Sequence, residues 1–226
     1  MTTAVLVHGG WHSASCWDLV RAELDADGIK SVAPQLPMTS TLDVDAAVVR
    51  ETLDNLGDDA VVVAHSWGGS PVTLGASGAP NVKHLIYLAA FMIEAGKPAP
   101  VDFRTLPPMP AFDMGPEVCT VVAEYAYDAF YHDVDRQVAA QCIAELRPFN
   151  RAGWDLVETE LEPAWKLVPT TYIVCAQDHG VNPDDQRAMA AQADDSVVLD
   201  TSHSPFLSQP RKVADIIAER VRKYSA

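Results

Sequence analysis

The sequence has few basic residues. It holds 16 Lys and Arg against 31 Asp and Glu, which gives a formal net charge of −15 at pH 7. A protein that binds nucleic acid needs a positive field to neutralise phosphates. This chain lacks such a field, so we expect no nucleic-acid partner. We interpret the surplus Asp and Glu as solvated residues on helix surfaces, where they favour solubility.

Cysteine is also scarce. The four cysteines are Cys16, Cys119, Cys142 and Cys175, and no two of them form a Cys-x-x-Cys pair. Their apolar or small neighbours indicate buried, reduced thiols. No two histidines have the helical spacing, with a carboxylate nearby, that is typical of a zinc site. We therefore expect no metal and no other cofactor.

Long hydrophobic runs, internal repeats and low-complexity tracts are absent. The apolar run at residues 4–7 follows Met1-Thr2-Thr3 and is too short for a leader peptide or a membrane span. We expect a cytoplasmic protein without a membrane partner. The oligomeric state stays open, with a homodimer as one option.

The overall composition indicates one folded main domain. The chain has 226 residues, of which 48% are hydrophobic and 21% are charged. That balance is close to ordinary globular usage and too apolar for a disordered chain. A single α/β domain comfortably uses this length.

Short β-branched runs alternate with longer segments of helical periodicity. This alternation predicts an α/β fold, with a mostly parallel sheet covered by helices on both faces. The predicted strands are residues 4–7, 31–33, 60–64, 82–89, 171–176 and 196–199. The predicted helices are residues 16–27, 44–56, 68–76, 184–193 and 212–223.

The alternation breaks in the middle of the chain. Residues 98–116 contain six prolines, too many for the interior of a strand or helix. Helical periodicity then covers residues 117–131 and 134–146. We interpret residues 93–168 as a small, mainly helical cap inserted into a core made of residues 1–92 and 169–226.

The segment Val63-Ala64-His65-Ser66-Trp67-Gly68-Gly69 contains an apolar strand that leads straight into a helix. This arrangement is typical of the nucleophile elbow of the α/β-hydrolase fold, whose motif is Gly-x-Ser-x-Gly. Ala64 replaces the first glycine, and alanine is the mildest replacement at a tight position. Ser66 is the candidate nucleophile. The plainer interpretation of this segment alone is a serine at a helix N-cap.

A second glycine-containing loop, His8-Gly9-Gly10-Trp11-His12, follows the first predicted strand. In the α/β-hydrolase fold, two backbone N–H groups bind the developing oxyanion. One comes from the residue after the nucleophile and the other from a loop in this position. We assign them to Trp67 and Gly10, and we interpret His8 as a buried brace of the loop.

A serine nucleophile requires a base, and the base requires an acid that orients it. His203 lies in a loop between the last predicted strand and the last helix, which is where this fold presents its histidine. Asp178 follows the strand at residues 171–176, which matches the order nucleophile, acid, histidine. Glu94, at the end of an earlier strand, is the second candidate acid.

Several aromatic residues and one histidine are candidates for substrate binding. Trp11, His12, Phe91 and Phe206 lie near the catalytic candidates in the sequence, whereas Tyr125 and Tyr131 lie in the predicted cap. An apolar pocket would use such side chains. Core packing is an equally good interpretation of most of them.

On these segments the sequence resembles bacterial esterases related to plant hydroxynitrile lyases and methyl-salicylate esterases. The resemblance covers nearly the whole chain, through residues 6–12, 63–69, 169–173, 177–178 and 202–206, and residues 130–133 and 145–148 in the cap. It implies the same three catalytic positions and a cap that forms much of the substrate pocket.

Two positions separate this chain from the lyase branch that it resembles. The lyases carry a lysine after the catalytic histidine and a hydroxyl residue after the first loop histidine, whereas this chain has Ser204 and Gly9. The resemblance therefore favours hydrolysis of a small-molecule ester through an acyl-enzyme. Cyanohydrin cleavage, a lactonase or amidase activity, and a non-catalytic ligand-binding role remain as alternatives.

Overall fold

A computed structural model describes residues 1–39, 41–94, 110–154 and 161–225. Within them, six strands form one parallel sheet in the order β2-β1-β3-β4-β8-β9. The strands are β1 (Thr2–Val7), β2 (Ser31–Val32), β3 (Asp59–His65), β4 (Val82–Leu88), β8 (Thr170–Cys175) and β9 (Asp195–Leu199). Each predicted strand is confirmed, to within one or two residues at its ends.

The central strands are buried on both faces because their side chains alternate between two apolar clusters. Val5 and Val62 belong to one cluster, whereas Leu6 and Val63 belong to the other. Successive residues of a strand point to opposite faces, so an uninterrupted apolar strand needs cover on both.

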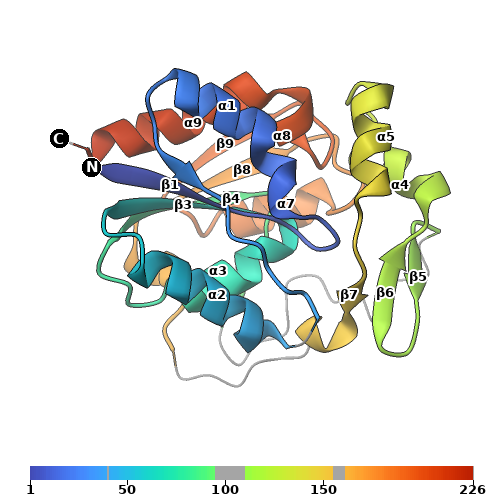
Figure 1. The fold of residues 1–226 in the computed structure, drawn as a ribbon, viewed down its shortest axis with the longest axis horizontal. Helices are drawn as coiled ribbons and strands as arrows, with labels where there is room; N and C mark the ends of the chain where they lie inside the picture. Colours follow the sequence, from blue (N-terminus) through green and yellow to red (C-terminus); the bar gives the residue numbers. More distant parts are fainter. Residues whose placement is uncertain (40, 95–109, 155–160, 226) are drawn as a thin grey trace.

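Helices supply that cover (Figure 1). The first cluster includes residues of α2 (Leu42–Asp54), α3 (Gly69–Gly75) and α7 (Pro183–Ala190). The second includes residues of α1 (Asp18–Ala26), α8 (Pro205–Ser208) and α9 (Pro210–Lys223). The predicted core helices are confirmed, with short 3-10 turns η1 (Ala14–Trp17) and η2 (Ser66–Gly68) before α1 and α3.

The middle of the chain has two described parts: residues 110–154 fold beside one end of the sheet (Figure 1), whereas residues 164–167 pack against α3. Its described elements are β5 (Phe112–Met114), β6 (Val118–Val121), α4 (Ala123–Phe130), α5 (Arg136–Ala144), β7 (Phe149–Asn150), η3 (Arg151–Trp154) and α6 (Ala164–Leu167). The three strands form a separate antiparallel sheet, in the order β5-β6-β7. We call residues 110–154 the cap segment; the predicted boundaries at residues 93 and 168 stay a prediction.

Two local predictions in the cap segment are wrong. The helix predicted over residues 117–131 begins at Ala123, because the β-branched residues of Val118–Val121 form a strand instead. Phe112–Met114 is also a strand, because this stretch between Pro110 and Pro116 has no proline of its own. The rest of the predicted proline-rich insertion, residues 98–109, lies outside the described residues.

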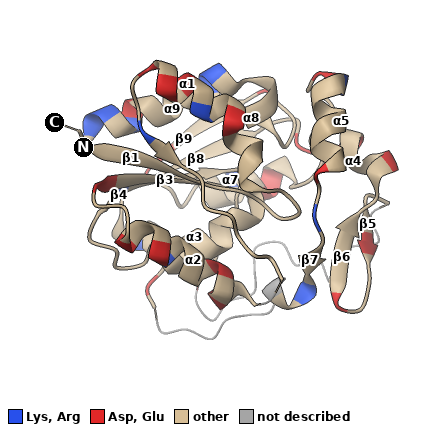
Figure 2. Cartoon of the chain, viewed as in Figure 1, with Lys and Arg blue, Asp and Glu red and all other residues tan. Residues whose placement is uncertain are grey.

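Charged residues are spread over the surface. Figure 2 shows Asp and Glu on helices of both layers and on the cap segment rather than on one element. This distribution agrees with the interpretation of the net charge as solvated helix surface. Among the helices of the described ranges, none is both long and apolar enough to cross a membrane.

Candidate active site

The segment around Ser66 forms a sharp turn between β3 and α3. Ser66 has a φ of 51°, in the left-handed region that a non-glycine residue seldom adopts. The neighbouring chain is packed closely, since a Cβ on Gly68 would lie 2.6 Å from the carbonyl oxygen of His8. Strained backbone of this kind persists where the surrounding structure holds it, and it is common at functional sites.

Ala64 occupies the position of the first glycine in the elbow motif, and the structure accommodates its methyl group. It lies in β3 between Val7 of β1 and Tyr87 of β4, and it is fully buried in the first apolar cluster. Its methyl group is therefore part of the core. The close approach that excludes a side chain occurs on the other side of the nucleophile, at Gly68.

His203 and Asp178 form a buried hydrogen-bonded pair. The Nδ1 of His203 lies 2.7 Å from the Oδ2 of Asp178. Their loops follow β9 and β8, adjacent parallel strands whose carboxyl ends meet at one edge of the sheet. Because an ionised carboxylate only accepts hydrogen bonds, the pair places the imidazole proton on Nδ1 and leaves Nε2 as the basic nitrogen.

Three further donors hold the carboxylate of Asp178. The backbone N–H groups of Gly180 and Val181 donate to Oδ1 at 2.7 and 2.9 Å. The side-chain amide of Gln186, on α7, donates to Oδ2 at 2.8 Å. Asp178 is therefore fixed in place and kept as an acceptor for His203.

Glu94, the second candidate acid, has a different neighbour. Its Oε2 lies 3.8 Å from the Nζ of Lys166 in α6. The structure thus brings His203 to Asp178 and places the carboxylate of Glu94 beside a lysine.

The elbow and the histidine loop are connected through His65. Its Nε2–H donates to the backbone carbonyl of His203 at 3.0 Å, and the two rings pack at a tilt of 53° with centroids 4.6 Å apart. Burial holds the pKa of His65 well below its usual value, so the ring is neutral. The residue before Ser66 therefore helps to position the loop that carries His203.

The loop after β1 lies against the elbow. A Cβ on Gly9 would be 2.9 Å from the Cβ of Ser66, and a Cβ on Gly10 would be 3.5 Å from the Cβ of Trp67. The two segments predicted to supply oxyanion donors are therefore in contact. Glycine at position 9 is required by this approach, because any side chain there would collide with Ser66.

His8 braces this loop from inside. Its Nε2 accepts from the backbone N–H of Leu36 at 3.0 Å, and its Nδ1–H donates to the carbonyl of Gly9 at 2.9 Å. Burial lowers the pKa of His8 to about 4, which keeps the ring neutral. These contacts agree with the bracing interpretation of His8.

The side chain of Trp67 is anchored by a buried carboxylate. Its indole N–H donates to Asp45, on α2, at 3.4 Å, and Asp45 also accepts from the backbone N–H of Met38 at 3.0 Å. Burial raises the pKa of Asp45. The ring of Trp67 meets that of Phe149 edge to face, with centroids 5.0 Å apart.

Comparison with known proteins places these features in a family. A model of the alpha/beta hydrolase family matches residues 4–216. The chain belongs to this family. Its similarity to Methylesterase 7 from Arabidopsis thaliana is 30% identity over 98% of this chain and 96% of the relative. A probable hydrolase, R7, from Phoma sp. is 27% identical to this chain, over 95% of this chain and 96% of the relative.

Solved structures of hydrolases have the same fold. A pyrethroid hydrolase from Sphingobium faniae JZ-2 superposes with a TM-score of 0.84 at 22% identity, over 100% of this chain and 99% of the other. The methylesterase MES16 from Arabidopsis superposes with a TM-score of 0.83 at 24% identity, over 99% and 100%. At these identities the structures show the shared alpha/beta hydrolase fold.

Among the predicted substrate-binding residues of this hydrolase, Trp11 and Phe91 lie at the elbow and its loop. Trp11 has a φ of 62°, stacks on Phe112 of β5, and donates its indole N–H to the carbonyl of Cys119 at 3.1 Å. The backbone N–H of Phe91 donates to the carbonyl of Ser66 at 3.1 Å. Trp11 therefore links the β1 loop to the cap segment, and Phe91 supports the elbow.

Phe206 and Tyr125 lie in different surroundings, and their role in substrate binding stays a prediction. Phe206 is fully buried in the second apolar cluster, where its ring packs against Trp17 and His65. Tyr125 lies on α4 and is 43% exposed. Nearness in sequence to a candidate catalytic residue, or membership of the cap, does not fix the face on which a side chain lies.

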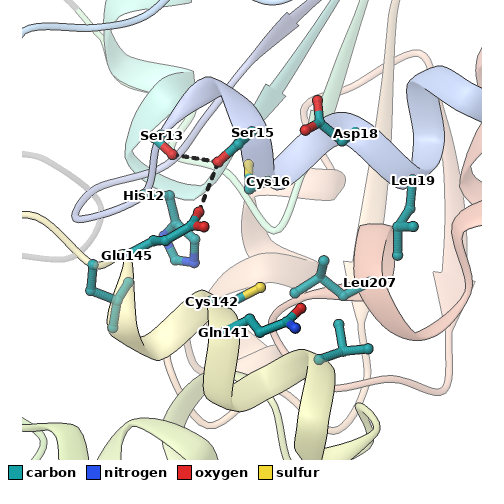
Figure 3. Close-up of a pocket in the computed structure, with 12 residues that line it drawn as sticks. His12, Ser13, Ser15, Cys16, Asp18, Leu19, Gln141, Cys142, Glu145 and Leu207 are labelled. Atoms are coloured by element: carbon teal, nitrogen blue, oxygen red, sulfur yellow. Dashed lines mark hydrogen bonds between the residues drawn. The ribbon is translucent and has the colours of Figure 1, made fainter.

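His12 and Tyr131 contact each other, with the Tyr131 hydroxyl 2.7 Å from Nε2 of His12. Both side chains are buried. On its outer side, His12 forms part of the wall of a pocket of about 240 Å³ between η1, α1 and α5. Figure 3 shows Glu145, after α5, reaching across this pocket to Ser15.

Sequence reasoning missed three polar residues that support the site. Gln186 holds Asp178, His65 holds the His203 loop, and Ser202 donates to the carbonyl of Phe130 at 3.0 Å, from the His203 loop to the cap segment. Gln186 had a detectable signal, because it is a polar residue on the stripe of α7 that also carries Met189.

Metal binding has no candidate site in the described ranges. Across residues 1–39, 41–94, 110–154 and 161–225, no group of three or more His, Cys, Asp or Glu side chains could hold a metal ion.

Proposed function

We propose that this member of the alpha/beta hydrolase family is a carboxylic ester hydrolase that uses Ser66 as nucleophile, His203 as base and Asp178 as the orienting acid. The buried 2.7 Å contact between His203 and Asp178 carries the proposal. It lies beside a strained serine turn and a glycine loop that packs against that turn. The methylesterase names of several relatives support ester hydrolysis as the reaction class.

In the proposed reaction, Nε2 of His203 takes the proton of Ser66 as the serine oxygen attacks the ester carbonyl. The backbone N–H groups of Gly10 and Trp67 donate to the oxyanion of the tetrahedral intermediate. The intermediate collapses when the alkoxide leaves with the proton from His203, which produces an acyl-enzyme. Water activated by His203 then attacks the acyl-enzyme and releases the acid and free Ser66.

The packing around Gly9 supports hydrolysis over cyanohydrin cleavage. A Cβ at this position would lie 2.8 Å from Nδ1 of His65 and 2.9 Å from Cβ of Ser66. The loop therefore has no room for the hydroxyl residue of the lyase branch. Ser204 is buried after His203, where the lyases that the chain resembles carry a lysine.

The proposal is tested by turnover of p-nitrophenyl esters of increasing acyl length and of simple methyl esters. We expect the wild-type protein to hydrolyse at least the short esters and Ser66→Ala to lose turnover to the level of the buffer. Ester turnover that survives in Ser66→Ala contradicts the proposal. Tight binding of small molecules without turnover would favour a receptor, and cyanide release from mandelonitrile would favour a lyase.

A further inference from the structure

One short hydrogen bond joins the cap segment to the loop after β1, and a second lies within that loop. The hydroxyl of Tyr131, which follows α4, lies 2.7 Å from Nε2 of His12. The Nδ1 of His12 lies 2.7 Å from the carbonyl oxygen of Gly10. A carbonyl only accepts, so Nδ1 carries the proton and Nε2 accepts from the tyrosine. The chain of donors therefore runs from Tyr131 through His12 to Gly10.

His12 is neutral in this chain. Burial lowers the pKa of its imidazole to about 3, since a charged ring would lose its solvation there. A neutral ring has one donor and one acceptor, and each has a partner in this arrangement. The tautomer is thus fixed by the carbonyl of Gly10 on one side and the hydroxyl of Tyr131 on the other.

The same loop is held by the cap segment at the next residue. Trp11 has a left-handed backbone conformation, and its carbonyl oxygen accepts a hydrogen bond from the backbone N–H of Arg147 at 2.7 Å. Its indole N–H donates to the carbonyl of Cys119. Left-handed backbone at a non-glycine residue costs free energy and persists only where neighbours hold it. Contacts from the cap segment therefore hold Trp11, between Gly10 and His12, in an unfavourable conformation.

We propose that Tyr131 and His12 are positioning residues for the oxyanion hole. This inference rests on the proposed function, in which the N–H of Gly10 binds the oxyanion. Tyr131 is fully buried and its hydroxyl is engaged by His12, so it acts through the loop and not by contact with substrate. The cap segment thereby sets the conformation of Gly10.

The first test is the kinetics of Tyr131→Phe. Removal of a whole oxyanion donor costs about 10²–10³ in kcat, and displacement of a donor costs less. We expect kcat to fall about ten- to hundredfold, with KM changed less than about twofold. The reason is that the donor acts on the transition state rather than on bound ester.

Two variants control for general loosening of the cap segment. Tyr127→Phe removes a hydroxyl that donates to the carbonyls of His132 and Val134, both inside the cap segment. Glu145→Gln weakens the contact with Ser15 that joins α5 to η1. We expect both variants to retain the kcat of the wild-type protein.

A double-mutant cycle tests whether the two residues act as one unit. His12→Asn keeps an amide donor at the distance of Nδ1 but loses the acceptor for Tyr131. We expect Tyr131→Phe to cause no further loss of kcat when it is added to His12→Asn. Independent losses that multiply in the double variant would overturn the inference.

An NMR measurement separates this inference from the proposed function. In wild-type protein labelled with ¹⁵N-histidine, we expect the ring of His12 to be the Nδ1–H tautomer, with its N–H protected from exchange with water. In Tyr131→Phe we expect this protection to be weaker. If the wild type hydrolyses esters and Tyr131→Phe has the same kcat, the inference is overturned but the proposed function is not. A wild type that hydrolyses no ester overturns the proposed function, even if the NMR signal of the hydrogen-bonded chain is present.

Discussion

At the scale of single residues, the contacts of Asp178 are the reason why we propose this carboxylate rather than Glu94 as the acid that orients His203. Four donors surround it: two backbone N–H groups, the amide of Gln186 and Nδ1 of His203. Together these four donors fix the orientation of the carboxylate. Glu94 lies beside Lys166 instead. The side chain of Asp178 is thus held in one orientation by its neighbours, which is what the proposed role requires.

Replacement of this carboxylate by an amide gives a direct prediction. In Asp178→Asn, an N–H group can face Nδ1 of His203 and favour the tautomer that has no free Nε2. We expect kcat for ester hydrolysis to fall by about 10⁴-fold, as in other triads with this change. The measurement is steady-state turnover with the fold checked by circular dichroism.

The matched control for this prediction is Glu94→Gln, which alters the other candidate acid in the same way. It should retain wild-type turnover, since its carboxylate lies beside Lys166 and not His203. Wild-type activity in Asp178→Asn together with inactivity in Glu94→Gln would move the acid to Glu94.

The places of the three candidate catalytic residues in the fold could be predicted from chain order. Ser66, Asp178 and His203 each follow a parallel strand, and the carboxyl ends of such strands meet at one edge of the sheet. Phe206 and Tyr125 could not be placed this way, because packing decides whether a helix residue faces the site, the core or solvent. The support from Gln186 depends on how the first turn of α7 folds back on the end of β8 and on Asp178, which chain order does not show.

At the scale of elements, the turn between β3 and α3 depends on the close approach of β1. Gly68 packs against the carbonyls of Val7 and His8, at 2.9 and 2.6 Å from the place of a Cβ. Backbone atoms cannot move aside as a flexible side chain can. The elbow therefore has a strict requirement at position 68, whereas position 64 accepts a methyl group within the strand.

A pair of opposite substitutions tests this difference. We expect Gly68→Ala to lower the free energy of unfolding by about 3 kcal/mol, at the upper end for overpacking, and to reduce ester turnover. Ala64→Gly should cost only about 1 kcal/mol. Urea unfolding followed by tryptophan fluorescence measures both. An equal or smaller loss in Gly68→Ala would show that the turn can relax and would contradict the model of the elbow.

The core strands were predicted well because they are buried on both faces and have one continuous apolar pattern. The cap segment was predicted poorly at Val118–Val121, which forms a strand although helical spacing continues into α4. The β-branched residues of this stretch gain partners only when β5 and β7 pair with it. Such pairing between short segments is a tertiary effect that local periodicity does not report.

At the scale of the whole molecule, burial of several histidines makes stability depend on pH. Burial lowers the pKa of His8 and His84 to about 4 and that of His12 to about 3. In the unfolded chain these groups bind protons near pH 6.5, whereas in the folded protein they resist protonation. The unfolded state binds more protons between these values, so stability falls as the pH is lowered from about 6.5 towards 4.

We predict that the free energy of unfolding falls as the pH is lowered from 7 to 5. Below the pKa that histidine has in the unfolded chain, each buried histidine should contribute a slope on the order of 1 kcal/mol per pH unit. Urea unfolding at a series of pH values measures it. His84→Gln, at a site that contacts Thr171 far along the sheet from Ser66, should reduce the slope without loss of turnover at pH 7. An unchanged slope in this variant would contradict the assignment to buried histidines.

The central claim is that Ser66 is the nucleophile of an ester hydrolase, and covalent labelling tests it most directly. The wild-type protein is treated with a fluorophosphonate, and the modified residue is located by peptide mass spectrometry. We predict one adduct, on Ser66, which forms in parallel with the loss of ester turnover and is absent in Ser66→Ala. Loss of turnover with the label on another residue, or equal labelling of Ser66→Ala, would contradict the account.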